Sequence, residues 1–269
     1  MLGRMGIYPN AYYNYLKHKK AAYYDEKQSI YDAIIETYHK HDGTVGYRMV
    51  HAYLEKQGII RSKLTIHKYM NTDLGLLCIT RRPNPNYEYG ETHNVFPNII
   101  EQDFECDEIN TKWLTDFTYL FLDNGEKRYN CSILDLHDRS IVASITDRHI
   151  TADLAKRTLE KALNSQPEIK GVLILHSDQG SQFTSKEFAE YCKSVNVTQS
   201  MSKAGYPYDN APMERYFNTL KNDCINLHRY ETEEALYTAV EEFAYVTYNH
   251  ERPHSHNGYR TPFDARYVA

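Results

Sequence analysis

The chain has 269 residues, of which 41% are hydrophobic and 25% charged, a composition typical of a globular protein with one large and one small domain. No apolar run approaches the ~20 residues of a membrane-spanning helix, and the N-terminus lacks a signal-peptide core. We therefore expect a cytoplasmic protein without a membrane partner. The five cysteines are scattered and never in C-x-x-C spacing, which argues against a disulfide framework and a zinc knuckle.

The net charge of −5 is unevenly distributed along the chain. Residues 1–82 contain 13 Lys/Arg and 7 Asp/Glu, whereas residues 83–269 contain 18 Lys/Arg and 29 Asp/Glu. This asymmetry suggests a basic binding module joined to a domain rich in carboxylates. The histidines of the C-terminal tail, His250, His254 and His256, favour a solvated or DNA-facing loop over a zinc site.

Three helices are predicted in the basic region. Apolar residues at helical spacing indicate one helix from about Glu26 to His39 and a second from about Tyr47 to Gln57. Ser62 is a good N-cap for a third, short helix. Two short helices joined by a glycine-containing turn, the last one basic, are typical of a helix-turn-helix that inserts its final helix into a major groove. A small helical bundle with solvated lysines fits the pattern equally well.

A proline-rich linker over residues 83–95 separates this region from a core predicted over residues 96–269. The hydrophobic periodicity then alternates between strands and helices. The strands are predicted at residues 113–121, 128–136, 141–146, 172–175 and 197–201, and the helices at residues 151–164, 185–194, 210–228 and 232–249. The order β-β-β-α-β-α-β-α predicts an α/β fold, an RNase H-like mixed five-stranded sheet with flanking helices, after a small all-α helix-turn-helix domain.

Two aspartates occupy positions in this sheet that favour a site. Asp116 falls in the middle of the first strand, and Asp178 follows the apolar fourth strand, where open α/β sheets build their sites. The first and fourth strands are neighbours in this topology, so the two carboxylates can lie side by side. Two carboxylates that lie side by side repel each other, and a divalent cation such as Mg²⁺ or Mn²⁺ bound between them removes this repulsion.

A third acidic residue, Glu214, lies near the start of the penultimate helix. That helix follows a loop rich in turn residues, with Asp209 or Asn210 as the predicted N-cap. Asn218 and Lys221 lie four and seven residues beyond Glu214, so one helical face presents a carboxylate, an amide and an ammonium. An ordinary exposed face explains any one of these residues, but the combination favours a site.

Several strings in the chain together resemble a known family. Asp178 and Glu214 are separated by 35 residues, the D-D-35-E spacing of retroviral integrases and many transposases. The longer strings that accompany this spacing are Trp113-x-Thr115-Asp116-x-Thr118, His176-Ser177-Asp178-Gln179-Gly180-Ser181-Gln182-Phe183, Tyr206-Pro207-x-Asp209-Asn210-Ala211, Tyr248-Asn249-x-Glu251-Arg252-Pro253-His254 and, in the predicted helix-turn-helix, Gly46-Tyr47-Arg48. With these strings the chain closely resembles OrfB-type transposases of the IS-three family of bacterial insertion sequences.

The resemblance implies that Asp116, Asp178 and Glu214 are catalytic and bind two Mg²⁺ or Mn²⁺ ions. One ion would activate a water or a 3′-hydroxyl, and the other would stabilise the leaving oxygen during cleavage and strand transfer. The DNA contacts that we predict come from Lys221, Asn218, Arg215, Arg48, Thr65, His67, Lys68 and Arg252.

The partners expected from the resemblance are insertion-sequence ends, target DNA, further copies of the chain and an upstream OrfA-type product or fusion, because no leucine zipper is visible before Tyr12. DNA binding would associate the protein with the nucleoid. Two alternatives share some of these features. A structure-selective RNase H-like nuclease has the same acids but no evident use for a helix-turn-helix. A non-catalytic DNA-binding regulator has no need of the acids.

Overall fold

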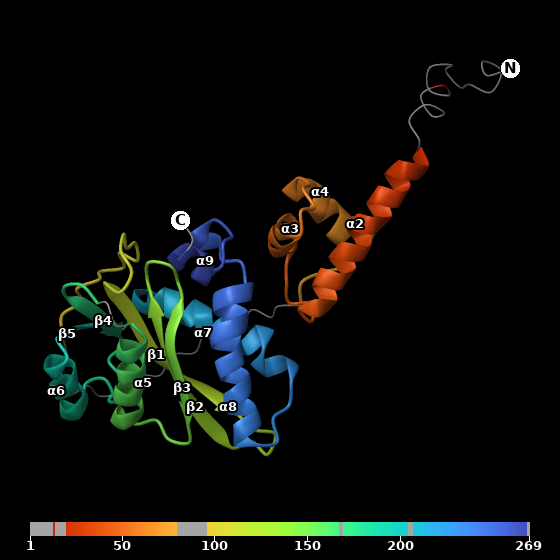
Figure 1. Ribbon diagram of the computed structural model, residues 1–269. Helices are drawn as coiled ribbons and strands as arrows, with labels where there is room; N and C mark the ends of the chain where they lie inside the picture. Colours follow the sequence, from red (N-terminus) through yellow and green to blue (C-terminus); the bar gives the residue numbers. More distant parts are fainter. Residues whose placement is uncertain (1–12, 14–19, 80–95, 167–168, 204–206, 268–269) are drawn as a thin grey trace. The chain divides into compact units, whose positions relative to one another are not determined.

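The computed structural model describes residues 13, 20–79, 96–166, 169–203 and 207–267 (Figure 1). The chain divides into two compact units, Met1–Ile79 and Thr80–Ala269. The linker predicted over residues 83–95 lies outside the described residues. In the described part of the chain, no helix is both long and apolar enough to cross a membrane.

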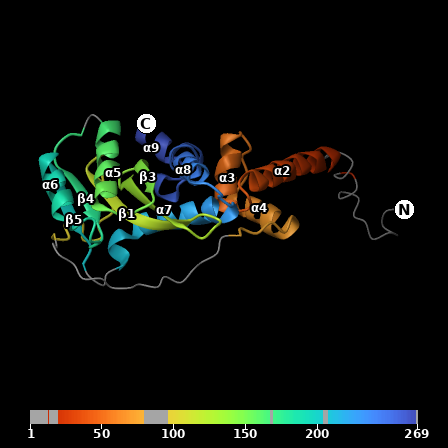
Figure 2. The ribbon, with the colours of Figure 1, turned by 90° about the horizontal axis from the view of Figure 1, so that it is seen from below.

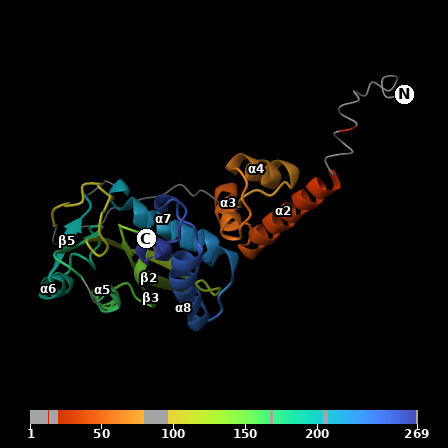
Figure 3. The ribbon, with the colours of Figure 1, turned by 45° about the horizontal axis from the view of Figure 1, so that its top comes forward.

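The N-terminal unit is helical, as predicted. It consists of α2 (Lys20–Lys40), α3 (Tyr47–Lys56) and α4 (Lys63–His67), which continues as the π-helix η2 (Lys68–Asp73). These helices enclose a small core, and Figure 3 shows α3 and α4 beside α2. Helix α2 begins six residues before the predicted start, because its first turns are exposed and so carry no buried apolar pattern. The buried residues of this core are Ile30, Ile34, Val45, Val50, Leu54, Ile66 and Met70.

The C-terminal unit contains a five-stranded mixed sheet in the order β3-β2-β1-β4-β5. Strands β1, β2 and β3 pair antiparallel, whereas β4 and β5 run parallel to β1. This is the predicted RNase H-like arrangement. The strands are β1 (Lys112–Phe121), β2 (Lys127–Asp135), β3 (Ile141–Asp147), β4 (Leu173–Ser177) and β5 (Val197–Met201).

Helices cover both faces of the sheet, as the front and lower views show (Figures 1 and 2). Helices α5 (Ala152–Ser165) and α6 (Lys186–Ser194) bury their apolar sides on the face that carries Trp113. Helix α7 (Ala211–Asp223) packs on the opposite face, together with α8 (Glu233–Glu242) and its π-helical continuation η5 (Phe243–Glu251). The sheet therefore separates two apolar cores, and β1, β2 and β3 contribute buried residues to both of them.

Short polar side chains begin four of the helices. The hydroxyls of Ser62, Thr151, Ser185 and Thr232 each accept a hydrogen bond from the backbone amide three residues later, at 3.1–3.2 Å. Such N-caps are worth ~1 kcal/mol each because they satisfy an amide that the helix leaves unpaired. The predicted cap at Ser62 is confirmed.

Three predicted boundaries are wrong for tertiary reasons. Strand β4 continues past Leu175 to Ser177, because its polar end still pairs with β5. Helix α7 ends at Asp223 rather than near His228. The next residue, Cys224, leaves the helical region (φ −137°, ψ −67°), and its Sγ lies 3.6 Å from the Tyr230 hydroxyl. The last long helix changes to a π-helix at Phe243. No local sequence signal marks these changes.

Side chains and chain segments cover the two edge strands. Asn249 of η5 bonds both the amide and the carbonyl of Ile141 in β3, each at 2.9 Å, and the Tyr245 hydroxyl accepts from the Ser144 amide at 2.9 Å. Along β5, the segment that precedes β1 bonds to the strand through Ile99, whose amide donates to Ser200 Oγ at 2.9 Å. Covered edges prevent strand addition by another chain.

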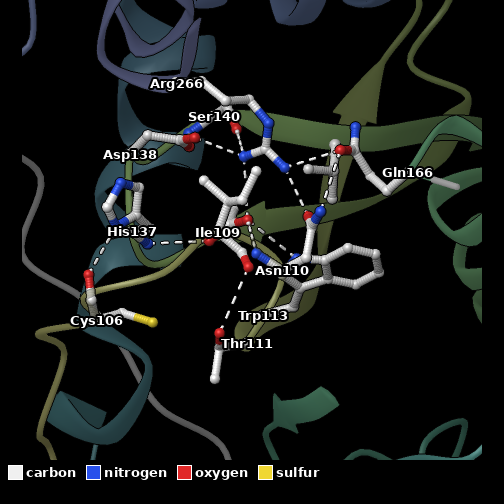
Figure 4. A network of polar contacts seen from close by, with 12 residues as sticks. Cys106, Ile109, Asn110, Thr111, Trp113, His137, Asp138, Ser140, Gln166 and Arg266 are labelled. Carbon is white, nitrogen blue, oxygen red and sulfur yellow. Dashed lines mark hydrogen bonds and ion pairs between the residues drawn. The ribbon is translucent and has the colours of Figure 1, made fainter. Parts of the chain in front are cut away.

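The C-terminal helix α9 (Pro262–Tyr267) is fastened to the sheet by one buried arginine (Figure 4). Arg266 donates to Asp135 at 3.1 Å and to Asp138 at 2.5 Å, and its other terminal nitrogen donates to Asn110 Oδ1 at 2.6 Å. Both carboxylates are fully buried. Buried charges of opposite sign therefore neutralise each other at this end of the sheet.

Candidate active site

The register between β1 and β4 brings two acidic residues together. Lys112 lies beside Ile174, and Leu114 lies beside His176. Continued by two residues, the same offset aligns Asp116 with Asp178, which directly follows β4. The predicted neighbourhood of the first and fourth strands is confirmed, and it carries the two aspartates to the carboxyl end of β4.

Helix α7 brings the third acidic residue to the same face of the sheet. Met213 and Tyr216 are buried against the sheet, on the face that Leu114 also occupies. The Asn210 amide, at the start of the helix, donates to the carbonyl of Thr115 at 3.3 Å, one residue before Asp116. The N-cap is Asn210, but its side chain bonds β1 and does not cap the helix.

The predicted row on α7 is present. Glu214 and Lys221 are half-buried beside the apolar stripe of the helix, and Asn218 is exposed between them. An edge position of this kind leaves a side chain in contact with both protein and solvent. These residues can therefore reach a ligand that lies against the sheet.

Charges interact strongly around Asp116. Burial raises the pKa of this carboxyl group well above its usual range, and the charges of Asp178 and Glu214 raise it further. The Phe117 amide, which donates to Asp116 Oδ1 at 2.7 Å, and the Lys221 ammonium oppose this rise in the pKa. Burial also lowers the pKa of Lys221, while the charge of Asp116 raises it. Four ionisable groups thus share one electrostatic environment.

The loop after β4 fixes the second aspartate. Asp178 is exposed, and its Oδ1 accepts a hydrogen bond from the Gly180 amide at 2.9 Å. A Cβ at position 180 would lie 2.9 Å from that same oxygen, so any other residue would displace the carboxylate. Loss of hydration beside the surrounding protein raises the pKa of Asp178, and the hydrogen bond from the Gly180 amide lowers it in part.

The three acids are gathered without forming a closed cage. Among the described residues, no group of three or more His, Cys, Asp or Glu side chains is already arranged to hold a metal ion. The donors at this place are nonetheless carboxylate oxygens, the ligands that suit hard divalent cations. The mutual repulsion that raises the pKa of Asp116 is what a bound cation would relieve.

Comparisons with known proteins give the family. The Integrase core domain matches residues 107–207, a second Integrase core domain model matches residues 195–262, and the HTH-like domain matches residues 25–84. The transposase of insertion sequence IS904 from Lactococcus lactis is 30% identical over 89% of this chain and 94% of that relative. The chain belongs to the insertion-sequence transposase family.

Further relatives of this transposase come from enterobacteria. A 31 kDa protein of insertion element IS600 from Shigella sonnei is 30% identical over 96% of the chain and 94% of its own length. Transposase InsF of IS3A from Escherichia coli is 34% identical over 62% of the chain and 58% of its own length. Among solved structures, the HTLV-2 integrase catalytic core domain in complex with magnesium is 20% identical, with a TM-score of 0.45, over 59% of this chain and 97% of that one.

The N-terminal unit of the transposase presents most of the predicted DNA-contacting residues on its surface. Arg48, His67 and Lys68 are exposed. Tyr47 joins two of them, because its hydroxyl accepts from Arg48 Nε at 3.1 Å and its ring meets that of His67 edge-on at 4.8 Å. Thr65 is half-buried, and its hydroxyl bonds Ser62 Oγ at 2.8 Å.

The predicted arginines of the core differ in their surroundings. Arg215 is exposed on α7. Arg252 is half-buried and donates to Asp223 at 3.1 Å, which ties the end of η5 to α7. Contacts of either arginine with DNA stay predictions, and Arg252 would have to leave a carboxylate partner to make them.

Sequence reasoning missed the buried polar residues around the acids. His176 is fully buried, and its ring nitrogens bond Ser200 Oγ at 2.8 Å and Ser202 Oγ at 3.2 Å. Burial lowers the pKa of His176 to about 4, so this ring is neutral at physiological pH. A histidine inside an apolar strand was the available signal, but its serine partners lie on β5 and directly after it.

Proposed function

We propose that this transposase catalyses metal-dependent cleavage and strand transfer of DNA at the ends of an insertion sequence, with Asp116, Asp178 and Glu214 as its catalytic carboxylates. The observation that carries the proposal is the parallel pairing of β1 with β4, whose register leads to Asp116 and Asp178, beside a helix whose Glu214 raises the pKa of Asp116. Three interacting carboxylates at one place are unfavourable unless a cation joins them.

The donor set fits Mg²⁺ or Mn²⁺, which bind hard oxygen ligands. Two bound ions would supply activation of the attacking water or 3′-hydroxyl and stabilisation of the leaving oxygen. Asp116, Asp178 and Glu214 would hold them, each from a different element of the fold. No serine or tyrosine nucleophile is required in this scheme, since water would attack in cleavage and a DNA 3′-hydroxyl would attack in strand transfer.

The remaining residues of the site would orient DNA. Lys221 provides a positive charge within reach of Asp116, where a phosphate would approach the carboxylates. Exposed Asn218 and Arg215 would extend the contact along α7. The exposed cations of α3 and η2, including Arg48 and Lys68, would bind a DNA duplex through the helix-turn-helix.

The partners of the reaction are insertion-sequence ends and target DNA. Strand transfer joins both ends of the element to target DNA, so we expect several copies of the chain to act together on DNA. An upstream OrfA-type product or fusion is a further partner that we propose for the reaction. Transposition would take place in the cytoplasm, at the nucleoid.

A strand-transfer assay on DNA that carries the element's own ends tests the proposal, with and without the upstream product. Wild-type protein should join these ends to target DNA in Mg²⁺, and Glu214→Gln should lower the rate more than ~10³-fold. Circular dichroism and DNA affinity should stay unchanged, because glutamine keeps the volume and helix propensity. Glu234→Gln, on the exposed start of α8, is the matched control and should behave as wild type.

Two results would contradict the proposal. Joining by Glu214→Gln at the wild-type rate would remove Glu214 from the chemistry. Cleavage by the wild-type protein without any joining would favour an RNase H-like nuclease, which shares the carboxylates but has no use for target DNA.

A further inference from the structure

A chain of buried hydrogen bonds connects the elements that carry the three acids, and one residue lies at its centre. Asp209 is 2% exposed and immediately precedes Asn210, whose amide bonds β1 beside Asp116. Glu214 follows one helical turn later. The carboxylate of Asp209 therefore lies at the start of the helix that presents Glu214 to the site.

Three donors from two other segments converge on this carboxylate. Asp209 Oδ2 accepts from the Lys203 backbone amide and from Asn98 Nδ2, both at 2.9 Å. Asp209 Oδ1 accepts from Gln102 Nε2 at 2.7 Å. Asn98 and Gln102 lie on the segment that covers the edge of β5. Asp209 thus ties the start of α7 both to this segment and to the chain that leaves β5.

The segment that leaves β5 also bonds the loop that contains Asp178. Ser202, one residue before Lys203, donates its amide to the Ser177 carbonyl at 2.9 Å, at the end of β4. Its own carbonyl accepts from Gln179 Nε2 at 2.9 Å. Ser177 and Gln179 flank Asp178 on both sides. Lys203 and Ser202 therefore link Asp209 to the residues that position Asp178.

From this circuit we infer that Asp209 is a positioning residue, which sets the spacing of Asp116, Asp178 and Glu214 for metal binding. The inference rests on the proposed function. Metal-binding carboxylates owe part of their affinity to the groups that orient them, and loss of such a group typically costs 10–100-fold in metal affinity or activity. Mg²⁺ is especially demanding, since it requires nearly ideal octahedral geometry.

The test measures metal affinity without DNA. The melting temperature of the full chain is followed during titration with MgCl₂, with KCl at matched ionic strength as the reference. Asp209→Ala removes both acceptor oxygens, and with them all three hydrogen bonds, and should raise the Mg²⁺ concentration at half-saturation about tenfold or more. The matched control is Asp138→Ala, which also removes a buried carboxylate. Asp138 lies six residues beyond Ser132, the residue of β2 that pairs with Asp116. The control variant should lower the melting temperature but leave the half-saturation concentration unchanged.

A conservative variant separates geometry from charge. Asp209→Asn keeps one acceptor oxygen for Lys203 and Asn98, and the Gln102 amide can turn to accept from the new NH₂ group. Its half-saturation concentration should stay within about threefold of wild type, far below the shift expected for loss of an orienting group. Equal losses in Asp209→Asn and Asp209→Ala would mean that the charge of Asp209 attracts the metal, and would overturn the positioning role.

Two further outcomes would be decisive. If Asp209→Ala does not fold, the double variant Asn98→Ala and Gln102→Ala removes the side-chain donors from a more exposed segment and should shift the half-saturation in the same direction. Unchanged metal affinity in the variant that folds would overturn the inference alone, provided wild type still responds to Mg²⁺ and joins DNA. A wild-type melting temperature that does not respond to Mg²⁺ would overturn the metal site, and with it this inference.

Discussion

Two clusters of carboxylates lie on the same sheet and differ in how their charge is balanced. At one place, Asp135 accepts from the Asn110 amide at 2.7 Å, the His137 amide at 3.0 Å and the Arg266 guanidinium at 3.1 Å. At the other, Asp116 accepts one short hydrogen bond from its neighbour Phe117, while two further acids raise its pKa. In the first cluster Asp138 also raises the pKa of Asp135, but the Arg266 guanidinium bonds both carboxylates and opposes this rise. In the second cluster the Lys221 ammonium interacts with Asp116 and opposes the rise in its pKa only in part.

Under the proposed function, this difference separates a structural cluster from a catalytic one. Buried carboxylates that serve only stability are neutralised by the chain itself, because an unpaired buried charge is costly. Carboxylates that keep repelling one another are stable only if a ligand from outside supplies the missing charge. Removal of a charge should therefore destabilise the Arg266 cluster, whereas removal of the Asp116 charge should stabilise the metal-free protein.

The largest stability effect should follow from removing the internal cation. Arg266→Met keeps much of the side-chain volume but leaves Asp135 and Asp138 buried without a cation. The free energy of unfolding at pH 7 should fall by about 3–5 kcal/mol, as measured by urea denaturation. Arg157→Met, which breaks a more exposed pair with Asp147, is the control and should cost no more than about 1 kcal/mol. A loss below that of the control would show that the cluster is not held by charge.

A smaller effect concerns pH and the positive region around His254. Burial, followed by the charges of Arg252 and Arg139, lowers the pKa of His254 to about 3. The unfolded chain binds this proton near pH 6.5 and the folded chain does not, so stability should fall as pH decreases between these two values.

This slope is up to about 1.4 kcal/mol per pH unit for one proton. Denaturation at several pH values should give a flatter profile for His254→Asn, whereas exposed His149→Asn should leave the wild-type slope. Identical slopes in all three proteins would contradict the electrostatic account of the C-terminal tail.

The smallest effect should come from Lys221, the cation that interacts with Asp116. Lys221→Ala should weaken DNA binding for all sequences alike and reduce its salt dependence by about one counterion. Fluorescence anisotropy across a salt series measures this slope. The exposed Lys186 of α6 is the control, since its removal should leave the slope unchanged. Equal slopes for the two variants would mean that Lys221 makes no phosphate contact and is an ordinary partly buried lysine.

Local patterns in the sequence predicted the elements and the acids, but not the partners of the buried polar groups. The alternation around Asp116 and the apolar run before Asp178 are local, and the parallel pairing of their strands follows from the topology. Asp209 instead bonds residues 111 and 107 positions away, and Arg266 bonds Asp135 across 131 positions. Periodicity records which face of an element is buried, whereas hydrogen-bond partners depend on how distant elements pack.

The most direct test of the account is the effect of Mg²⁺ on the stability of wild type and Asp116→Asn. Because burial and the repulsion from Asp178 and Glu214 raise the pKa of Asp116, the neutral variant should be more stable than wild type in EDTA at pH 7. Mg²⁺ at 100 times its dissociation constant should stabilise wild type by about 2.7 kcal/mol and the variant far less. If the variant is no more stable in EDTA and Mg²⁺ stabilises both proteins equally, Asp116 does not belong to a metal site.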